Sequence, residues 1–474
     1  MHDQEDARAD ADGLTDLGRW TWAEVAAALA AGGLLRAWML GRFFQTDGDP
    51  LIYGDIAKNL LLRGSYGFSS GGGVEPTLIR LPGYPLFLAA CFRLFGIDHY
   101  GAACWIQIVL ELAGCLLLAD VARRIVPQGM GRGAARATLW LAVLCPFTAV
   151  YAATPMAEAL TLFSIAVALW AAVRFVAHPG WRDALPFTVA VTYVALLRPD
   201  GALVAVAFAP ALLLALRSAP RQRVAMVVMC GLLALAPFAG WTARNWRVFH
   251  VVQPLAPRSA TDPGDPVYQG WDAWTRTWCL DFICTYEVCW NVPGGALDIG
   301  QLPARAMVSP AQRAETQALA NAYNANGYNL TPALDAGFAR LAAERTAAHP
   351  WRTHVLLPLG RMADMWLRPR VENLPIDLDW WVYAHHHKET VFSWAYAALN
   401  ALYLLLAAAG LWLRPRLWQW MLLYCVLRSA LLRTVQAPEA RYTLECFPIL
   451  FVAGGVALAA GWRRLRSLGQ RSTA

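Results

Sequence analysis

The sequence predicts an all-α integral membrane protein, and its apolar composition and long apolar runs carry that prediction. Of its 474 residues, 57% are hydrophobic and only 15% are charged. A helix needs about 20 consecutive apolar residues to cross a bilayer, and about ten runs approach that length. We therefore expect about ten transmembrane helices. They centre on 22–40, 104–126, 137–151, 157–176, 184–197, 202–216, 224–241, 391–413, 417–432 and 447–462.

Two of these runs, 184–197 and 202–216, are short and are separated only by Arg-Pro-Asp-Gly. They either cross the membrane fully or form a re-entrant pair. If neither run crosses the membrane, the orientation of every other span is unchanged, because two spans fewer preserve the alternation.

The arginines of the short loops set the orientation, because basic residues resist translocation. Alternation through ten spans places all of these loops on one side, which is therefore the cytoplasmic side and holds both termini. The net charge of +7 then follows from topology and calls for no nucleic-acid partner. The arginines are Arg123, Arg124, Arg132, Arg136, Arg174, Arg182, Arg217, Arg221, Arg223, Arg414, Arg416, Arg463, Arg464 and Arg466.

This topology divides the chain into three parts. Residues 1–246 form an N-terminal transmembrane region whose first external loop is 45–101. Residues 247–390 form an external segment, and 391–474 carry the C-terminal transmembrane helices. The first 20 residues or so are acidic, unlike the start of a signal peptide, so we expect the first span to be retained.

The first external loop predicts short helices that lie in the membrane interface. Asp49 followed by Pro50 is a helix start, and Gly64 is a stop. A second helix is expected over 85–96. Both are too short to span and carry apolar stripes, which suits the interface plane.

The segment 247–390 is predicted to be mostly helical. Ser309-Pro310 and Thr331-Pro332 are start signals, while Gly327 and His349-Pro350 are stops. A group of tryptophans near its beginning indicates core packing, an interfacial aromatic belt or sugar stacking. These are Trp271, Trp274, Trp278 and Trp290.

Four cysteines, Cys279, Cys284, Cys289 and Cys446, fall on the external side, where disulfides persist. The first three lack a nearby fourth ligand at a spacing typical of tetrahedral zinc. A disulfide among the four stays an open alternative, and so does its pairing.

Several short patterns on the external face resemble those of one family. Asp49 is followed four residues later by Tyr53, and Arg80 stands just before a Pro-Gly-Tyr-Pro turn. Further matches are the turns Pro-Met-Ala-Glu and Arg-Pro-Asp-Gly and the Arg-Tyr pair before the last span. Together they resemble GT-C glycosyltransferases, in the branch of lipid A aminoarabinose transferases and protein O-mannosyltransferases.

The resemblance implies a membrane glycosyltransferase that moves a sugar from a polyprenyl-phosphate donor to an envelope acceptor, which is a lipid such as lipid A, a glycan or a protein. It also implies, together with the preference for arginine over lysine, a bacterial inner membrane and a periplasmic active site. Neither the sugar nor the acceptor can be named. The sequence requires no cofactor and leaves a divalent metal open.

The resemblance identifies Asp49 as the catalytic carboxylate. From the residues alone, Asp49 could equally be a helix cap, and Asp47 competes for the role. Asp55 lies inside the helix and is expected to be solvated. Glu158 is the second catalytic candidate, as a partner of Asp49 or a metal ligand. The alternative is that Glu158 is simply an acidic residue at a helix N-terminus, where the helix dipole favours a negative charge.

Arg80 and Arg441 are the candidates for binding the donor phosphate, since the planar fork of arginine suits phosphate oxygens. Tyr442 adjoins Arg441, and Lys58 is a further candidate that could instead snorkel towards the interface. We expect Arg80 and Arg441 to converge although they are far apart in the sequence.

Other candidates carry simpler alternatives. Arg198 and Asp200 face outward and could form a local ion pair that shapes their turn. His387 belongs to a His-His-His-Lys run for which phosphate contact or interfacial solvation is expected rather than a metal site. Tyr53 is a candidate through the family pattern.

Charged residues within spans are costly unless they are paired. Glu111 is expected to pair with Arg428 or with Arg36. Because most candidate acids and cations gather on one face, the sequence favours an enzyme over a carrier or flippase for a lipid-linked sugar. A non-catalytic scaffold, which would not need Asp49, is a second rival.

Overall fold

The computed structural model describes residues 22–217, 220–377 and 379–472. These residues are mostly helical, and their only strands form one antiparallel hairpin of β1 (Gly67–Ser70) and β2 (Gly73–Pro76). Six of the described helices are long and apolar enough to cross a membrane. The all-α membrane class is therefore confirmed. The six are α2 (Trp22–Phe43), α5 (Tyr100–Ile125), α8 (Glu158–Ala177), α11 (Pro220–Phe249), α17 (Tyr383–Trp412) and α19 (Phe447–Ser472).

The expected number of ten spans is not confirmed. The run 137–151 is two helices, α6 (Gly131–Val143) and α7 (Pro146–Ala152), bent by 55° at their break, and together they would make a seventh span. Three other expected spans are helices of 14 to 17 residues, which are shorter than a straight crossing requires. They are α9 (Trp181–Leu197), α10 (Ala202–Ala215) and α18 (Trp418–Leu432).

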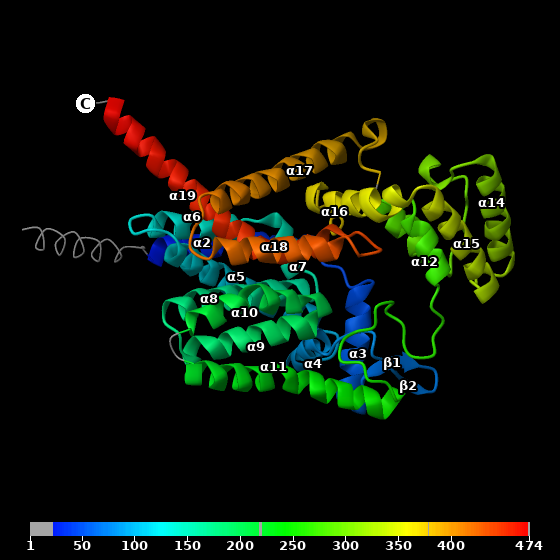
Figure 1. Ribbon diagram of the computed structural model, residues 1–474, viewed down its shortest axis with the longest axis horizontal. Helices are drawn as coiled ribbons and strands as arrows, with labels where there is room; N and C mark the ends of the chain where they lie inside the picture. The colour runs from blue at the N-terminus through cyan, green and yellow to red at the C-terminus, as the bar shows by residue number, and fades with distance from the viewer. Residues whose placement is uncertain (1–21, 218–219, 378, 473–474) are drawn as a thin grey trace, which may run out of the picture.

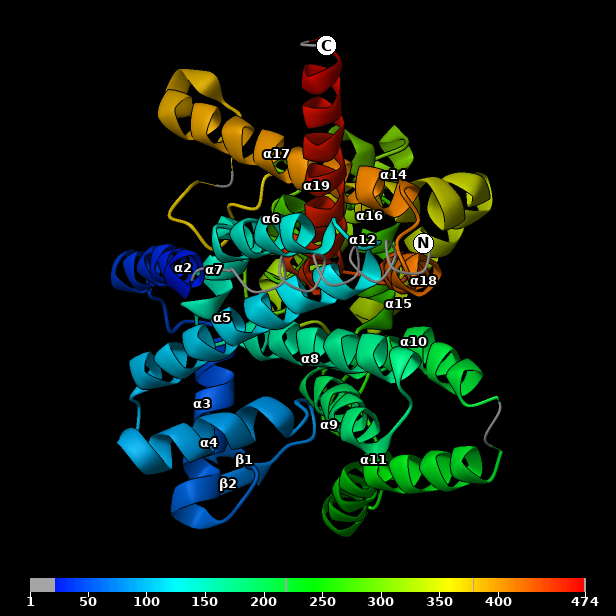
Figure 2. The ribbon, with the colours of Figure 1, turned by 90° about the vertical axis from the view of Figure 1, so that its left-hand side faces the viewer.

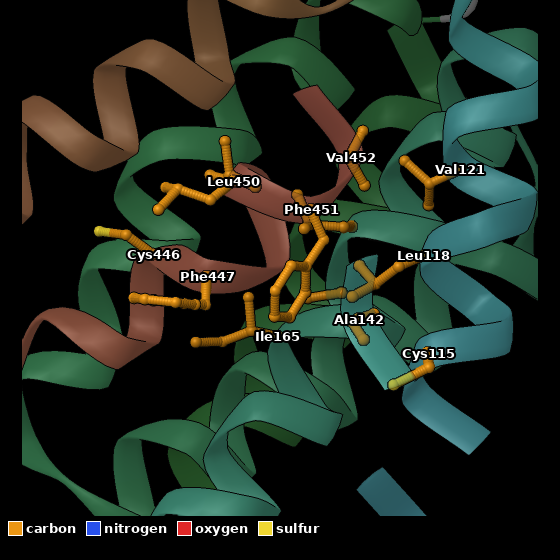
Figure 3. Close-up of a cluster of buried hydrophobic side chains, with 14 of the residues drawn as sticks. Cys115, Leu118, Val121, Ala142, Ile165, Cys446, Phe447, Leu450, Phe451 and Val452 are labelled. Atoms are coloured by element: carbon orange, nitrogen blue, oxygen red, sulfur yellow. The ribbon is translucent and has the colours of Figure 1, made fainter. Parts of the chain in front are cut away.

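The main hydrophobic core lies where α19 crosses α5, α6 and α17. In Figure 3, Phe451 of α19 points towards Leu118 and Ala142, and all three are buried. Glycines let these helices approach closely: a Cβ on Gly410 would stand 1.8 Å from the carbonyl oxygen of Ala453. Close packing at small residues helps to hold membrane helices together, because lipid tails are as apolar as the side chains and provide no hydrophobic driving force for helix association. The core gives a fixed base to the turn that precedes α19.

Two helices of the first loop run across the main bundle. In Figure 1, α3 (Asp49–Arg63) lies across the direction of α8, α9 and α11, which stack side by side. It ends at Gly64 in the left-handed conformation, as the stop signal predicted. A Cβ on Gly54 would stand 1.7 Å from the hydroxyl oxygen of Tyr100, so this glycine permits the contact between α3 and α5. Helix α4 (Gly83–Phe95) follows close to the predicted bounds.

The segment after α11 forms a small helical unit, which Figure 1 shows at the end of the molecule opposite the C-terminus. Its elements include α12 (Gln269–Arg276), α13 (Phe282–Cys284), η3 (Thr285–Cys289), α14 (Pro310–Ala325), α15 (Pro332–Ala348) and α16 (Leu357–Leu367). Both predicted start signals are confirmed, because the hydroxyls of Ser309 and Thr331 cap α14 and α15. Trp271, Trp274 and Trp278 are buried in its core.

Three of the arginine-rich loops meet at one end of the bundle. The backbone N–H of Arg416 donates to the carbonyl of Ile125 at 2.8 Å, and its guanidinium donates to the carbonyl of Val176 at 3.3 Å. The loops after α5, α8 and α17 are therefore neighbours, as the predicted alternation requires.

A buried ion pair joins α2 to α5. The Nε of Arg36 lies 2.5 Å from Glu111, and its Nη1 donates to the carbonyls of Gly32 and Val143 at 3.0 and 2.7 Å. Of the two expected partners of Glu111, Arg36 is therefore the one that the fold uses. Arg428 pairs elsewhere.

Removing one member of this pair should destabilise the fold strongly, because the remaining charge has no water around it. We expect Glu111→Leu to cost about 3 kcal/mol, and Arg36→Met with Glu111→Leu to recover most of that loss. Thermal unfolding of the purified variants measures both. A double variant as unstable as the single one would contradict an electrostatic cause.

Candidate active site

Asp49 is the first residue of α3 and lies between two arginines. Its Oδ1 accepts from Nη2 of Arg80 at 2.8 Å, and its Oδ2 accepts from Nη1 of Arg441 at 3.0 Å. Arg80 stands in the loop between β2 and α4, while Arg441 stands in the 3₁₀ turn η6 (Ala440–Cys446) before α19. The two guanidinium groups thus converge on the Asp49 carboxylate, whereas their expected convergence on the donor phosphate stays a prediction.

Asp49 does not cap its helix. The capping position is Gly48, and no side chain forms a capping hydrogen bond there. The alternative that Asp49 serves only as a cap is therefore wrong. Burial raises the pKa of the Asp49 carboxyl, but the charges of Arg441 and Arg80 outweigh it and hold that pKa below its usual range. Asp49 is consequently ionised at neutral pH.

Arg441 also contacts two further carboxylates. Its Nη1 lies 3.8 Å from Glu158, and its Nε lies 2.7 Å from Glu439. The hydroxyl of Tyr442 donates to the same Glu439 at 2.5 Å. Glu158 is thus a partner of Asp49 through Arg441 rather than by direct contact, and its Oε2 is buried without a hydrogen-bond partner among the described residues.

The network continues through two more arginines. Arg198 lies 3.3 Å from Glu158, 3.4 Å from Asp200 and 3.0 Å from Glu445. Arg428, which is fully buried, pairs with Asp200 and lies 2.9 Å from Glu445. The local pair of Arg198 and Asp200 exists, but it is one link of a longer alternating chain of charges.

Apart from Arg428 and Glu445, these residues line a cavity of about 1120 Å³. Its polar wall includes Asp47, Asp49, Tyr53, Arg80, Glu158, Arg198, Asp200, Arg441 and Tyr442, and its apolar wall includes Ile52, Ile79, Leu431, Leu432 and Val435. Burial raises the pKa of Tyr53 to about 12, so its hydroxyl stays protonated. The guanidinium of Arg80 lies 5.7 Å from the centre of the Tyr53 ring.

Three predicted residues lie outside this arrangement. Lys58 pairs with Asp98 at 3.2 Å and does not line the cavity. His387 is exposed and neighbours the Tyr383 ring, which agrees with plain solvation. Asp55 is not simply solvated, because it accepts from the backbone N–H and hydroxyl of Ser69 at 2.7 Å and anchors the β-hairpin.

Sequence reasoning missed Glu439 and Glu445. Both flank Arg441 in the run Glu-Ala-Arg-Tyr-Thr-Leu-Glu, and acids on either side of a candidate phosphate ligand were a signal that could have found them. It also missed Arg428 as a member of the site, because only the fold brings α18 against the turn at Asp200.

Among the described residues, two groups of side chains that can ligate a metal have their ligand atoms close together. The first is Cys279, Cys284 and Cys289, but a disulfide joins the first two, which settles the pairing that the sequence left open. The second is Asp377, Asp379 and His386, of which Asp377 lines the cavity. At Asp49 both carboxylate oxygens are engaged by arginines, so a cation there would have to displace one of them.

Residues 76–242 match the family model described as dolichyl-phosphate-mannose-protein mannosyltransferase. No curated protein matches the chain. Two solved structures are similar at 11% identity over 96% of this chain and 52% of theirs. They are the oligosaccharyltransferase AglB from Archaeoglobus fulgidus in complex with an inhibitory peptide and a dolichol-phosphate (TM-score 0.48) and the oligosaccharyltransferase of the same organism in the apo form (TM-score 0.43).

This chain therefore spans about half the length of those structures. The family match includes Arg80, Glu158, Arg198 and Asp200, which are four of the residues that line the cavity. It confirms the resemblance to glycosyltransferases of the GT-C superfamily that the first loop and the turns had indicated.

Proposed function

We propose that this protein transfers a sugar from a polyprenyl-phosphate donor to an envelope acceptor at the periplasmic face of a bacterial inner membrane. One observation carries the proposal: an ionised carboxylate, Asp49, lies between two arginines in a large cavity beside the interfacial helices. The family match supports a sugar transferase, and the apolar wall of the cavity suits a polyprenyl chain.

In the proposed reaction, an acceptor hydroxyl oxygen attacks the anomeric carbon of the donor sugar. The bond between that carbon and the phosphate oxygen breaks, and its electron pair leaves with the polyprenyl phosphate. Asp49 takes the proton of the hydroxyl as general base. Arg80 and Arg441 stabilise the negative charge that develops on the phosphate.

Asp49 and the donor phosphate would compete for the same two arginines. Without donor, the arginines hold the Asp49 pKa low and make it a weak base. A bound phosphate draws their charge away, so the pKa of Asp49 rises towards its usual range. The Asp49 carboxylate is therefore a stronger base when the leaving group is in place than in the donor-free protein.

The proposal is tested with the purified protein in lipid nanodiscs and a panel of labelled polyprenyl-phosphate sugars. Release of polyprenyl phosphate together with a new glycoside is expected for one of them. Mass analysis of envelope glycans with and without the gene identifies the natural product. Movement of the lipid-linked sugar across vesicles without any transfer would instead support a flippase.

The sidedness of the site gives a further prediction. Reporter fusions after Ser70 and after Gly131 should give opposite signals, because 45–101 is expected to be periplasmic and the loop of Arg123 to Arg136 cytoplasmic. The fusions are read with one enzyme that is active only in the periplasm and one that is active only in the cytoplasm. Identical signals at both points would contradict the proposed face of the active site.

A further inference from the structure

Three aromatic residues at four-residue intervals line the same cavity as Asp49. Phe282, Tyr286 and Trp290 lie on the short helical stretch of α13 and η3 and its final turn. Their ring centres are 6.0 to 6.2 Å apart in all three pairs. The spacing places the rings on one face of the stretch, so they form a continuous aromatic surface.

The stretch that carries these rings is tightly held. The disulfide joins Cys279 to Cys284, and the Asp281 carboxylate accepts from the backbone N–H of Cys284 at 2.9 Å. Arg305 in turn holds Asp281 at 2.8 Å. The aromatic surface is therefore presented on a fixed support, which lowers the entropy lost when a ligand binds.

Two of the rings are left open although the same unit buries other aromatic side chains. Trp290 is 49% exposed and Tyr286 is 55% exposed, whereas Trp271, Trp274 and Trp278 are at most 2% exposed. The core of this unit is thus complete without Tyr286 and Trp290. Their exposed faces are available to whatever occupies the cavity.

The lining of the same cavity also includes polar side chains from the loop after α16, together with Ile376. Glu372, Asn373 and Asp377 line the same cavity. The Nδ2 of Asn373 is buried and has no hydrogen-bond partner among the described residues. An acceptor group on a ligand in the cavity would satisfy this donor.

We propose that Phe282, Tyr286 and Trp290 form the acceptor subsite and that it binds a sugar ring. The inference rests on the proposed function and names its acceptor class as a saccharide. The apolar C–H face of a pyranose stacks on aromatic rings, while its edge hydroxyls need both donors and acceptors. Asn373 supplies the donor, and Glu372 and Asp377 supply the acceptors.

A lipid chain does not account for the buried amide of Asn373, because it would leave that donor without a partner. An aromatic belt in the membrane interface does not account for the aromatic surface either. Such a belt faces lipid on the outside of the bundle, whereas these rings line the cavity that holds Asp49.

The test measures binding separately from catalysis. Purified wild type, Trp290→Ala and Tyr286→Ala are titrated with envelope oligosaccharides, with lipid A and with Ser/Thr-containing peptides. We expect oligosaccharides to bind the wild type, and each alanine variant to bind about tenfold more weakly. Trp290→Phe should keep most of the affinity because it keeps a stacking ring.

Trp351→Ala is the matched control, since Trp351 is 68% exposed but does not line the cavity. It should bind oligosaccharides like the wild type. Equal losses in Trp351→Ala, or wild-type binding of peptide but not of saccharide, would overturn the proposal. Weakened binding of the polyprenyl-phosphate donor in Trp290→Ala, with saccharide binding unchanged, would also overturn it.

These outcomes separate the two proposals. Saccharide binding that depends on Trp290, without release of polyprenyl phosphate from any donor by the wild type, supports the subsite and refutes the proposed transfer. Transfer by the wild type that is equally fast in Trp290→Ala, at oligosaccharide concentrations below saturation, supports the reaction and refutes the subsite.

Discussion

Replacing Asp49 with asparagine should lower sugar transfer by at least about 10²-fold, the usual contribution of a general base. The amide has nearly the shape of the carboxylate, and its oxygen can still accept a hydrogen bond from one arginine. It cannot take a proton from the acceptor hydroxyl. Turnover in nanodiscs with saturating donor and acceptor measures this loss.

Asp47→Asn is the matched control. Asp47 is exposed and lines the same cavity, two residues before Asp49. Its replacement by asparagine removes the same charge as Asp49→Asn does. We expect it to keep most of the wild-type turnover, and both variants to keep melting temperatures close to that of the wild type. Near-normal turnover in Asp49→Asn with an inactive Asp47→Asn would assign the base to Asp47.

The pH profile offers a second check on Asp49. Because Arg441 and Arg80 hold its pKa below the usual range in the donor-free protein, the base stays ionised throughout the neutral range. Turnover should therefore fall only on the acid side, and donor saturation should move that fall to higher pH. A shift to lower pH on donor binding would contradict competition between Asp49 and phosphate for the arginines.

Local signals in the sequence predicted local structure well. Ser309 and Thr331 cap helices because their hydroxyls need only reach a backbone N–H three residues on. Gly64 ends α3 because the left-handed conformation there suits glycine. Such features depend on a few neighbouring residues, so one sequence is enough to identify them.

The site was predictable only in part, because its contacts join distant residues. Asp49 and Arg441 are 392 positions apart, and their meeting depends on the family pattern rather than on any local rule. Asp49 belongs both to a helix-start signal and to the family pattern of a catalytic carboxylate. The sequence alone does not show whether Asp49 caps its helix, whereas the fold does. The expected number of ten spans is not confirmed for a related reason, since bends and short helices depend on packing that hydropathy does not record.

Replacing Arg441 or Arg80 with alanine should lower turnover by about 10²-fold or more, since preorganised cations stabilise the leaving phosphate. Lysine at either position should restore activity only in part, because an ammonium group lacks the planar fork that binds two oxygens. Arg80 gives the cleaner test. Among the described ion pairs it contacts Asp49 alone, whereas Arg441 also contacts Glu158 and Glu439.

The two alanine variants should therefore differ in stability while sharing the catalytic loss. Arg441→Ala leaves Glu158 and Glu439 with one cation fewer, so its melting temperature should fall further than that of Arg80→Ala. Arg93→Ala, which removes an exposed arginine of α4 that does not line the cavity, controls for net charge. Donor affinity is measured by titration with the polyprenyl-phosphate sugar. If Arg80→Ala bound and turned over donor like Arg93→Ala, Arg80 would have no part in holding the phosphate, and its contact with Asp49 would be structural.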